Sequence, residues 1–259
     1  MSETALQEGV LEAKVAFITG AGSGIGRATA LAMAREGARV AIADRDEAGL
    51  NATRDLLSGH GADALVLPLD ITDSGAVVEA IASVVERYGR LDIAHNNAGI
   101  ALPPCGFEDY ELDAFRRVLD INLMGTVNCM QAEIRQMLKQ GGGGAIVNTA
   151  SAAGVVAAPG LSAYIASKSA VIGLTRAAAV EFGARGIRIN SVSPGYVYTP
   201  MTAADTAEAA AEKAIIAAHP IGRLGKPEEI AETVVWLASG KAGYLLGANI
   251  MADGGYTAQ

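Results

Sequence analysis

Seven short apolar runs alternate with segments of helical spacing along almost the whole chain, and this alternation restricts the possible folds more than any other feature. The runs lie at residues 14–20, 38–44, 62–70, 91–99, 141–151, 186–194 and 248–255. Buried strands joined by helical crossovers pair in parallel, and right-handed crossovers place helices on both sides of the sheet. The sequence therefore predicts an α/β fold, a doubly wound Rossmann-type sheet of seven parallel strands with helices on both faces.

The segments between the runs carry apolar residues at helical spacing. This spacing predicts helices over residues 24–37, 47–57, 73–88, 112–139 and 164–183, in the Ala-rich stretch before His219, and after Pro227. The longest of them contains Asn122, a poor helix former that is followed by Gly125. The pair predicts a local distortion inside that helix.

The hydrophobic pattern continues to the last ten residues without a Pro-rich or Ser-rich linker, so we expect one domain over residues 1–259. Residues 1–12 are expected to form a loose N-terminal extension. Residues from about 196 to 220 follow the sixth run and are rich in small side chains, which indicates a lid over a substrate site. A plain surface helix is the alternative for this segment.

Composition excludes several classes of partner. The net charge of −8 argues against nucleic acid, because phosphates reward a basic surface. No apolar run reaches the roughly 18 residues that a membrane-spanning helix needs, and the acidic N-terminus does not resemble a signal peptide. Two cysteines, with no cluster of metal-ligand spacing, fit a reducing compartment. We therefore expect a cytoplasmic protein that acts on a small molecule and holds no metal.

A glycine-rich turn, "TGAGSGIG", joins the first run to the first helix. Gly20, Gly24 and Gly26 do not follow the G-x-G-x-x-G fingerprint strictly, but the physics is shared. Residues without Cβ allow a tight turn and close approach of a pyrophosphate to the positive end of a helix. This turn predicts a dinucleotide site, and a strand–helix turn without a ligand is the alternative.

Two acidic residues end the next two runs and lie at the same predicted edge. Asp44 follows Gly20 by 24 residues, a spacing at which a carboxylate accepts hydrogen bonds from a ribose diol and repels a 2′-phosphate. This favours NAD over NADP, although Arg45 next to it could hold the phosphate and Asp44 could instead cap the following helix. Asp70 could contact adenine or cap the helix after it.

Six motifs in order give the chain its resemblance to a known family: "TGAGSGIG", "NNAG", "NLMG", "NTASAAG", "YIASK" and "PGYVYTP". The chain resembles the compact single-domain branch of the short-chain dehydrogenase/reductase family from about residue 14 to its end. The resemblance implies that Tyr164 is the catalytic acid/base, Lys168 its partner, Ser151 the hydroxyl that orients substrate, and Asn122 the fourth member. It also implies a homotetramer.

The family's cofactor contacts fall on the same strand ends. The resemblance and the turn together predict contacts to the dinucleotide from Gly20, Ser23, Gly24, Ile25, Gly26, Asp44, Arg45, Asp70, Ile71, Asn97, Ala98, Gly99, Tyr164, Lys168, Pro194, Gly195, Val197 and Thr199. Asn96 is implied to support the adenine-ribose side of the cofactor and the central strand.

Tyr164 and Lys168 lie four residues apart, on one face of a helix. A free phenol has a pKa near 10, and the positive charges of Lys168 and of an oxidised nicotinamide should lower it toward neutral pH. Ser151 ends the fifth run, where its hydroxyl can meet the phenol over the same crevice, or can simply cap a turn. Asn122 could hold a water that extends a proton path from Lys168, or could be a satisfied core amide.

Small and apolar residues near these side chains indicate the substrate. Ala153, Leu161, Tyr196 and Met201 are the candidate substrate contacts, and they favour a small, mostly apolar secondary alcohol or ketone. "NTASAAG" with "HPIGR" is similar to family members that oxidise alicyclic alcohols and cyclic diols. The alternatives are an NADPH-dependent carbonyl or 3-oxoacyl reductase that uses the same residues, and a non-catalytic nucleotide-binding scaffold or sensor.

Overall fold

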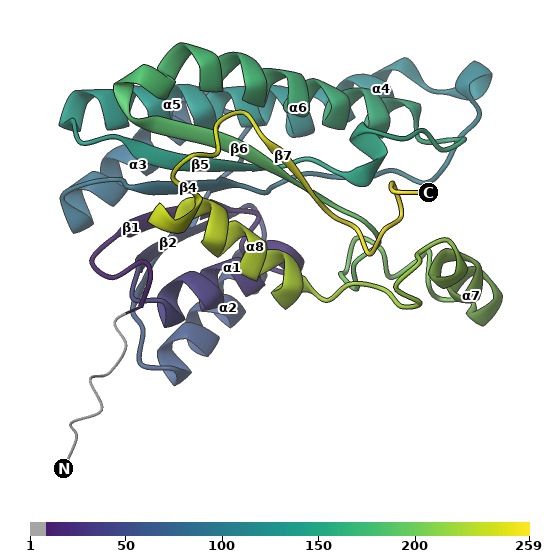
Figure 1. Cartoon of the computed structure of the whole chain (residues 1–259), viewed down its shortest axis with the longest axis horizontal. Helices are drawn as coiled ribbons and strands as arrows, with labels where there is room; N and C mark the ends of the chain where they lie inside the picture. Colours follow the sequence, from purple (N-terminus) through teal and green to yellow (C-terminus); the bar gives the residue numbers. More distant parts are fainter. Residues whose placement is uncertain (1–8) are drawn as a thin grey trace.

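A parallel sheet of seven strands forms the centre of the computed structural model, which describes residues 9–259 (Figure 1). The strand order is β3-β2-β1-β4-β5-β6-β7, and all neighbouring pairs are parallel. The strands are β1 Val15–Thr19, β2 Arg39–Asp44, β3 Ala64–Pro68, β4 Ile93–Asn96, β5 Gly144–Thr149, β6 Ile187–Pro194 and β7 Asn249–Ala252. The predicted fold class is confirmed, and each apolar run contains one strand.

Helices cover both faces of the sheet (Figure 1). One face carries α1 Gly24–Arg35, α2 Glu47–Gly59 and α8 Pro227–Ala238, and the other carries α3 Ser74–Tyr88, α5 Gly125–Gln140 and α6 Ser162–Phe182. Ala16 and Ile18 of β1 pack into the first core, while Val15 and Phe17 pack into the second. This alternation is what period-two strand geometry requires of a sheet buried on both sides. Within residues 9–259, every helix is too short or too polar to cross a membrane.

The strand order reverses between β1 and β4, which are neighbours in the sheet but far apart in sequence. The chain moves outward from β1 to β3, then crosses back and continues in the other direction from β4. Connections on the two sides of this reversal leave toward opposite faces, so a crevice opens at the carboxyl ends of β1 and β4. The fold therefore places a ligand site at this edge.

The predicted helix over 112–139 is interrupted. It divides into α4 Leu112–Leu119, a π-helical segment Asp120–Met124 and α5. The distortion predicted at Asn122 is confirmed, because this residue lies in the π-helical segment and its amide bonds to the backbone of Ile100 outside the helix. Short 3-10 turns occupy Phe107–Asp109, Ala152–Gly154, Gly183–Arg185 and Gly240–Ala242.

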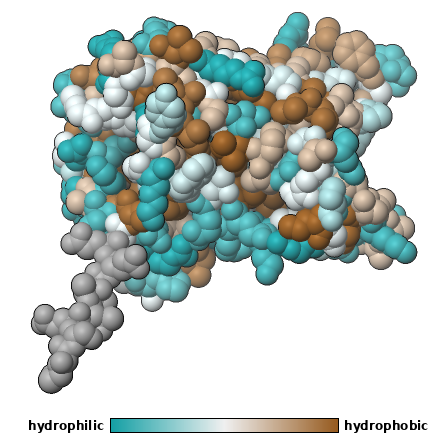
Figure 2. Space-filling model, viewed as in Figure 1, coloured by the Kyte–Doolittle hydropathy of each residue, from teal (hydrophilic) through white to brown (hydrophobic). Residues whose placement is uncertain are grey.

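The candidate lid is only partly helical. Residues 200–208 form turns, and α7 covers Ala209–Ala217. Figure 1 shows α7 set apart from the sheet, and in Figure 2 a notch in the outline separates this projection from the α4 end of the molecule. The segment therefore lies beside the carboxyl ends of the strands rather than against the core.

The described part of the N-terminal segment is packed, not loose. The Leu11 side chain is fully buried in the first core, its amide donates to the carbonyl of Glu36, and the Val10 amide donates to the Glu36 carboxylate. The prediction of a loose extension is therefore wrong for residues 9–12. Residues 1–8 lie outside the described residues.

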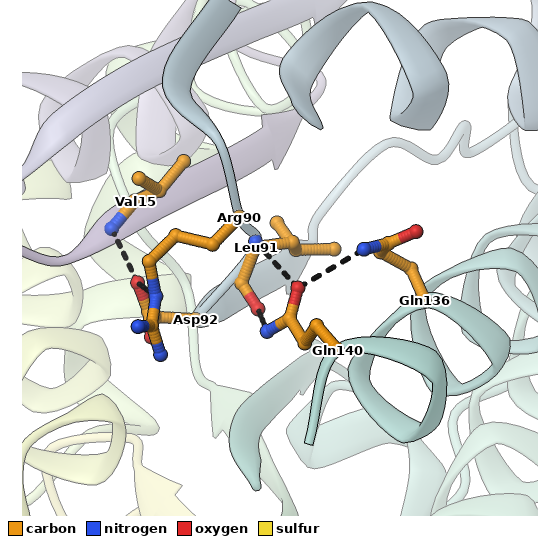
Figure 3. A network of polar contacts seen from close by, with 6 residues as sticks. All are labelled: Val15, Arg90, Leu91, Asp92, Gln136 and Gln140. Atoms are coloured by element: carbon orange, nitrogen blue, oxygen red, sulfur yellow. Dashed lines mark hydrogen bonds and ion pairs between the residues drawn. The ribbon is translucent and has the colours of Figure 1, made fainter. Parts of the chain in front are cut away.

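A polar network fastens the opposite edge of the sheet (Figure 3). Asp92 accepts hydrogen bonds from the Val15 amide at 3.0 Å and from the Arg90 guanidinium. Gln140, at the end of α5, exchanges two hydrogen bonds with the backbone of Leu91. These bonds connect the start of β1, the start of β4 and the end of α5. They lie at the amino ends of the strands, away from the edge where the carboxyl ends meet.

A buried carboxyl lies on the α5 side of the sheet. Glu133 is fully buried, and Asn96 donates to its Oε2 at 3.0 Å while its Oε1 has no hydrogen-bond partner. Burial raises the pKa of Glu133 to about 8, against an ordinary value of 4.5. The folded protein therefore holds this proton more tightly than the unfolded chain, and stability falls as the pH rises from about 4.5 to 8.

Replacing Glu133 by Gln should remove this pH dependence. Between pH 5 and 8 the free energy of unfolding of the native chain should fall relative to Glu133→Gln by several kcal/mol, since one pKa unit corresponds to about 1.4 kcal/mol. Urea denaturation of both proteins at pH 5.5 and 8.5 measures the difference. Parallel pH dependence in the two proteins would contradict a protonated Glu133.

Candidate active site

The carboxyl ends of β1, β2, β4, β5 and β6 surround one cavity of about 290 Å³. Nearly all of the predicted cofactor residues line it: Gly20, Ser23, Gly24, Ile25, Asp44, Arg45, Asp70, Ile71, Asn97, Ala98, Gly99, Tyr164, Lys168, Pro194, Gly195, Val197 and Thr199. Gly26 is the exception, because it is buried behind the glycine turn. The structure thus brings together residues from the whole length of the chain.

The glycine turn has a shape that larger residues could not adopt. Gly20 and Gly24 have φ angles of 65° and 51°, in the left-handed region. A Cβ on Gly26 would lie 2.1 Å from the Gly20 carbonyl oxygen, so this position accepts no side chain. Ser23, the residue before α1, makes no capping hydrogen bond with its side chain, and the first turn of α1 has no acidic residue. The positive end of α1 therefore faces the cavity without a protein anion, which fits a pyrophosphate.

The carboxylate of Asp44 is held by two backbone amides. Its Oδ2 accepts from Gly22 at 2.9 Å and its Oδ1 accepts from Asp46 at 3.0 Å. Asp46, not Asp44, is the residue that precedes α2. Asp44 is half-buried and lines the cavity, so its remaining lone pairs are available to ribose hydroxyls. Arg45 is exposed at the rim.

Asp70 also lines the cavity but does not cap the next helix. Its Oδ1 accepts from the amide and the hydroxyl of Thr72, and these bonds, with the nearby charge of Arg45, hold the pKa of Asp70 below its usual range. Asp73 caps α3, because its carboxylate accepts from the amides of Gly75 and Ala76. The capping alternative for Asp70 is therefore wrong, and its carboxylate is ionised at the cavity wall.

The two asparagines of "NNAG" point in opposite directions, as successive strand residues do. Asn97 lines the cavity and donates to the carbonyls of Thr19 and Gly20, each at 3.3 Å. Asn96 is buried away from the cavity and donates to Glu133 and Asn148. Of the two roles implied for Asn96, these bonds fit the one in the central strand, whereas Asn96 does not reach the cavity that would hold the cofactor, and Asn97 lines it instead.

Three of the four predicted catalytic residues line the cavity. Tyr164 and Lys168 come from α6, and Ser151 follows β5. Asn122 lies behind the wall, where its amide exchanges hydrogen bonds of 2.8 and 2.9 Å with the backbone of Ile100 and donates to Ser167. The side-chain amide of Asn122 therefore has its hydrogen-bond partners, as the alternative of a satisfied core amide predicted. These bonds hold the loop after β4 beside the cavity.

Lys168 is buried, and its ammonium donates to the Thr149 carbonyl at 2.8 Å. Desolvation lowers the pKa of Lys168 to about 8. The ammonium nitrogen lies 5.7 Å from the centre of the Tyr164 ring. The lysine is thus close to the phenol but anchored to a backbone oxygen.

The pKa of Tyr164 is raised, not lowered, in the chain itself. Burial of the hydroxyl is the largest cause, the Ser151 hydroxyl acts against it, and the nearby Tyr196 phenol adds to the rise. The joint effect of Lys168 and an oxidised nicotinamide on this pKa stays a prediction. In the chain alone burial dominates, so the predicted lowering of the pKa has to accompany binding of the dinucleotide.

Ser151 caps a turn and also lines the cavity. Its Oγ accepts from the Ala153 amide at 3.1 Å at the start of the 3-10 turn, which is the capping alternative that the sequence left open. Because the oxygen acts as acceptor in this bond, the hydroxyl hydrogen stays free to donate to a substrate oxygen. Capping therefore orients the group without consuming its donor.

The candidate substrate residues are not all at the cavity. Met201 lines it, whereas Ala153, Leu161 and Tyr196 lie outside the lining. Sequence reasoning missed other members of the wall, of which Thr149 is the most informative. The sequence feature that could have identified Thr149 is its position at the end of β5, two residues before Ser151.

His219 joins the two ends of the candidate lid. Its Nε2 accepts from the Tyr196 amide at 3.3 Å, and its Nδ1 lies 2.7 Å from the Ile215 carbonyl and so donates to it. The imidazole also stacks on Tyr256 of the C-terminal tail, with ring centres 4.9 Å apart. A structural role for His219 is therefore what the contacts show.

Comparison with known proteins finds dehydrogenases that match nearly the whole chain. A family model described as enoyl-(acyl carrier protein) reductase matches residues 20–257. A 2,5-dichloro-2,5-cyclohexadiene-1,4-diol dehydrogenase of Sphingobium indicum is 43% identical over 96% of this chain and 98% of its own length. A cyclohexanol dehydrogenase of an Acinetobacter species is 41% identical over 95% of this chain and 96% of its own length. The crystal structure of a carveol dehydrogenase from Mycobacterium avium in complex with NAD superposes with a TM-score of 0.93, at 31% identity, over 97% of this chain and 100% of that one.

A methyl group on Gly26 should damage the turn and the dinucleotide site together. We expect Gly26→Ala to weaken NAD binding at least tenfold and to lower stability by about 1–3 kcal/mol, because the Gly20 carbonyl must move. Gly59→Ala is the matched control, since a Cβ there meets no atom within 4 Å, and it should be neutral or stabilising by about 0.5–1 kcal/mol. Calorimetric titration with NAD and thermal unfolding measure both effects. Unchanged NAD affinity in Gly26→Ala would contradict the assignment of the turn.

Proposed function

The chain belongs to the short-chain dehydrogenase/reductase family, and we propose that it is an NAD-dependent dehydrogenase of small alicyclic secondary alcohols or diols. The observation that carries the proposal is the convergence of Ser151, Tyr164 and Lys168 on the cavity that begins at the glycine turn. The family relationship supports the reaction class. The preference for NAD and the substrate class are the proposed parts.

The cavity fits a nicotinamide dinucleotide. The uncapped start of α1 suits the pyrophosphate, and the Asp44 carboxylate suits an adenosine ribose with a free 2′-hydroxyl. When bound, the dinucleotide supplies the hydride acceptor or donor and, in its oxidised form, a positive charge. Lys168, which lines the same cavity, would hold the nicotinamide end of the dinucleotide.

The chain's own residues handle the proton. Ser151 donates to the substrate oxygen and so orients the carbinol toward Tyr164. As the phenolate, Tyr164 takes the hydroxyl proton during oxidation, and as the phenol it gives a proton to the carbonyl oxygen during reduction. Lowering the pKa of a phenol by about three units requires about 4 kcal/mol, and one unit charge at about 6 Å supplies roughly 3 kcal/mol at an effective dielectric of 20. The charge of Lys168 alone therefore does not supply the free energy needed to lower the pKa of the buried phenol. The positive charge of the oxidised cofactor would supply the rest.

Apolar side chains support an alicyclic substrate. Ile100, Ile121 and Met201 line the cavity. The two curated relatives are named for ring alcohols, one a chlorinated cyclohexadiene diol and one cyclohexanol. A compact apolar ring with one or two hydroxyls fits this wall better than a phosphorylated sugar. We also propose, from the family resemblance, a cytoplasmic homotetramer.

Cofactor choice separates this function from the alternative NADPH-dependent carbonyl or 3-oxoacyl reductase, which Arg45 at the rim would suit. We expect the native chain to bind NAD at least tenfold more tightly than NADP, because the Asp44 carboxylate repels a 2′-phosphate. Asp44→Ser should narrow or reverse the preference. Calorimetric titration with both dinucleotides decides the question, and tighter binding of NADP by the native chain would reject the NAD proposal.

The acid/base assignment predicts a shift in the pH profile. Tyr164→Phe should lose at least a thousandfold in kcat for cyclohexanol or a cyclohexane diol while NAD binding persists. In Lys168→Met the acidic limb of kcat/KM for oxidation should move to higher pH, because removing a cation raises the pKa of the phenol. Initial rates of NADH formation from pH 6 to 10 measure this. If Tyr164→Phe keeps the native rate, Tyr164 is not the acid/base, and if the native chain oxidises none of these alcohols, a binding protein without turnover becomes the better account.

A further inference from the structure

His95 is a fully buried imidazole that the reaction described above does not use. It lies in β4, where it pairs with Val147 of β5. Its Nε2 is 2.9 Å from the Thr149 hydroxyl oxygen, while its Nδ1 has no hydrogen-bond partner. A buried polar ring in the centre of a sheet is costly unless its bond is needed, so the contact with Thr149 calls for an explanation.

The neighbouring amide decides which ring nitrogen carries the proton. Asn97 donates through Nδ2 to the carbonyls of Thr19 and Gly20, so its Oδ1 is turned toward Thr149. The Thr149 hydroxyl donates to that oxygen at 3.3 Å and has no second hydrogen to give. His95 must therefore donate from Nε2, and the unpartnered Nδ1 is an acceptor, which is less costly to bury than a free N–H.

The bonds form one directed chain across three strands. His95 of β4 donates to Thr149 of β5, Thr149 donates to Asn97 after β4, and Asn97 donates to the Gly20 carbonyl in the turn after β1. The carbonyl of the same Thr149 accepts the Lys168 ammonium at 2.8 Å. Thr149 is thus the residue at which the glycine turn and the catalytic lysine are joined.

We propose that His95 is a positioning residue, which fixes Thr149 and through it both the dinucleotide turn and the Lys168 ammonium. The inference rests on the proposed function for its link to the reaction, but its link to cofactor binding does not require any substrate. Burial keeps the imidazole neutral, since it lowers the pKa of His95 to about 3, so the N–H donor is constant throughout the working pH range.

Without this donor the Thr149 hydroxyl is free to rotate. It can then turn its hydrogen away from Asn97, and the half-buried amide oxygen of Asn97 loses its partner. The Asn97 side chain supports the Gly20 carbonyl, against which Gly26 packs. An apolar residue at position 95 would fill the space but would leave the turn and the lysine without a common anchor.

The first test is spectroscopic and uses the native chain. The chain has three histidines, so ring ¹⁵N–¹H correlation spectra are simple to assign with His95→Leu. We expect one ring to show an Nε2–H proton protected from exchange and a chemical shift constant from pH 5 to 9. An Nδ1–H tautomer, or titration of this ring near pH 6.5, would overturn the proposal even if no variant folds.

The second test is a double-mutant cycle on cofactor binding. His95→Leu should weaken NAD binding about tenfold, which is the loss expected when one buried hydrogen bond of a network is broken. Thr149→Val should do the same, and the double variant should be no weaker than either single variant, because both break one chain. His95→Gln keeps an N–H donor and should recover most of the affinity. Additive losses, or native affinity in His95→Leu, would refute the positioning role.

A third measurement separates this inference from the proposed function. In His95→Leu the acidic limb of kcat/KM should move to higher pH, because the Lys168 ammonium is less well held near the phenol. If the native chain oxidises no alcohol but His95→Leu still loses NAD affinity, the proposed function fails and the positioning role stands. If alcohols are oxidised with an unchanged pH profile and affinity in the variant, the positioning role fails alone.

Discussion

Parallel pairing of all seven strands is the constraint on which the site depends. Because every strand runs the same way, all carboxyl ends meet at one edge, and the reversal of order at β1 and β4 keeps helices from closing that edge. Residues separated by more than a hundred positions, such as Gly20 and Ser151, then share one cavity. The polar network at the opposite edge, around Asp92 and Gln140, holds the strand starts and leaves this edge free for chemistry.

Burial sets the electrostatic character of the site. Desolvation lowers the pKa of Lys168 and raises the pKa of Tyr164, so both groups are pushed toward their neutral forms. A site of this kind is sensitive to one additional charge, since little solvent is present to screen it. Positioning then matters as much as charge, and the Thr149 carbonyl that holds Lys168 is itself held by hydrogen bonds from inside the sheet.

Most of the fold was predictable because buried parallel strands are nearly continuous apolar runs, and each run found here contains a strand. The strand-end residues of the site followed from the same pattern. Leu11 was missed because two adjacent apolar residues, Val10 and Leu11, in a polar segment show neither helical nor strand periodicity. The raised pKa of Tyr164 in the chain alone could not be predicted, because helical spacing places Lys168 on the same face but reports nothing about desolvation. The prediction assigned Asn96 to the cofactor side because the sequence does not show which of two adjacent asparagines faces the cavity. Successive strand residues point to opposite faces, and only the structure shows that Asn97 is the one at the cavity.

The hydrogen bonds that His219 makes to Tyr196 and Ile215 have an evolutionary consequence. Residues 197–218 leave the scaffold beside Tyr196 and return to it at an imidazole that bonds both ends, while α7 makes little contact with the sheet. Val197, Thr199 and Met201 at the start of this stretch line the cavity, and Thr199 lies close to Gly24 of the dinucleotide turn, so these residues are constrained. Residues 203–214 do not line the cavity, so their number and side chains can change without disturbing strand register or the dinucleotide turn. A chain built this way can acquire a new substrate range by changing about a dozen residues and keeping the rest.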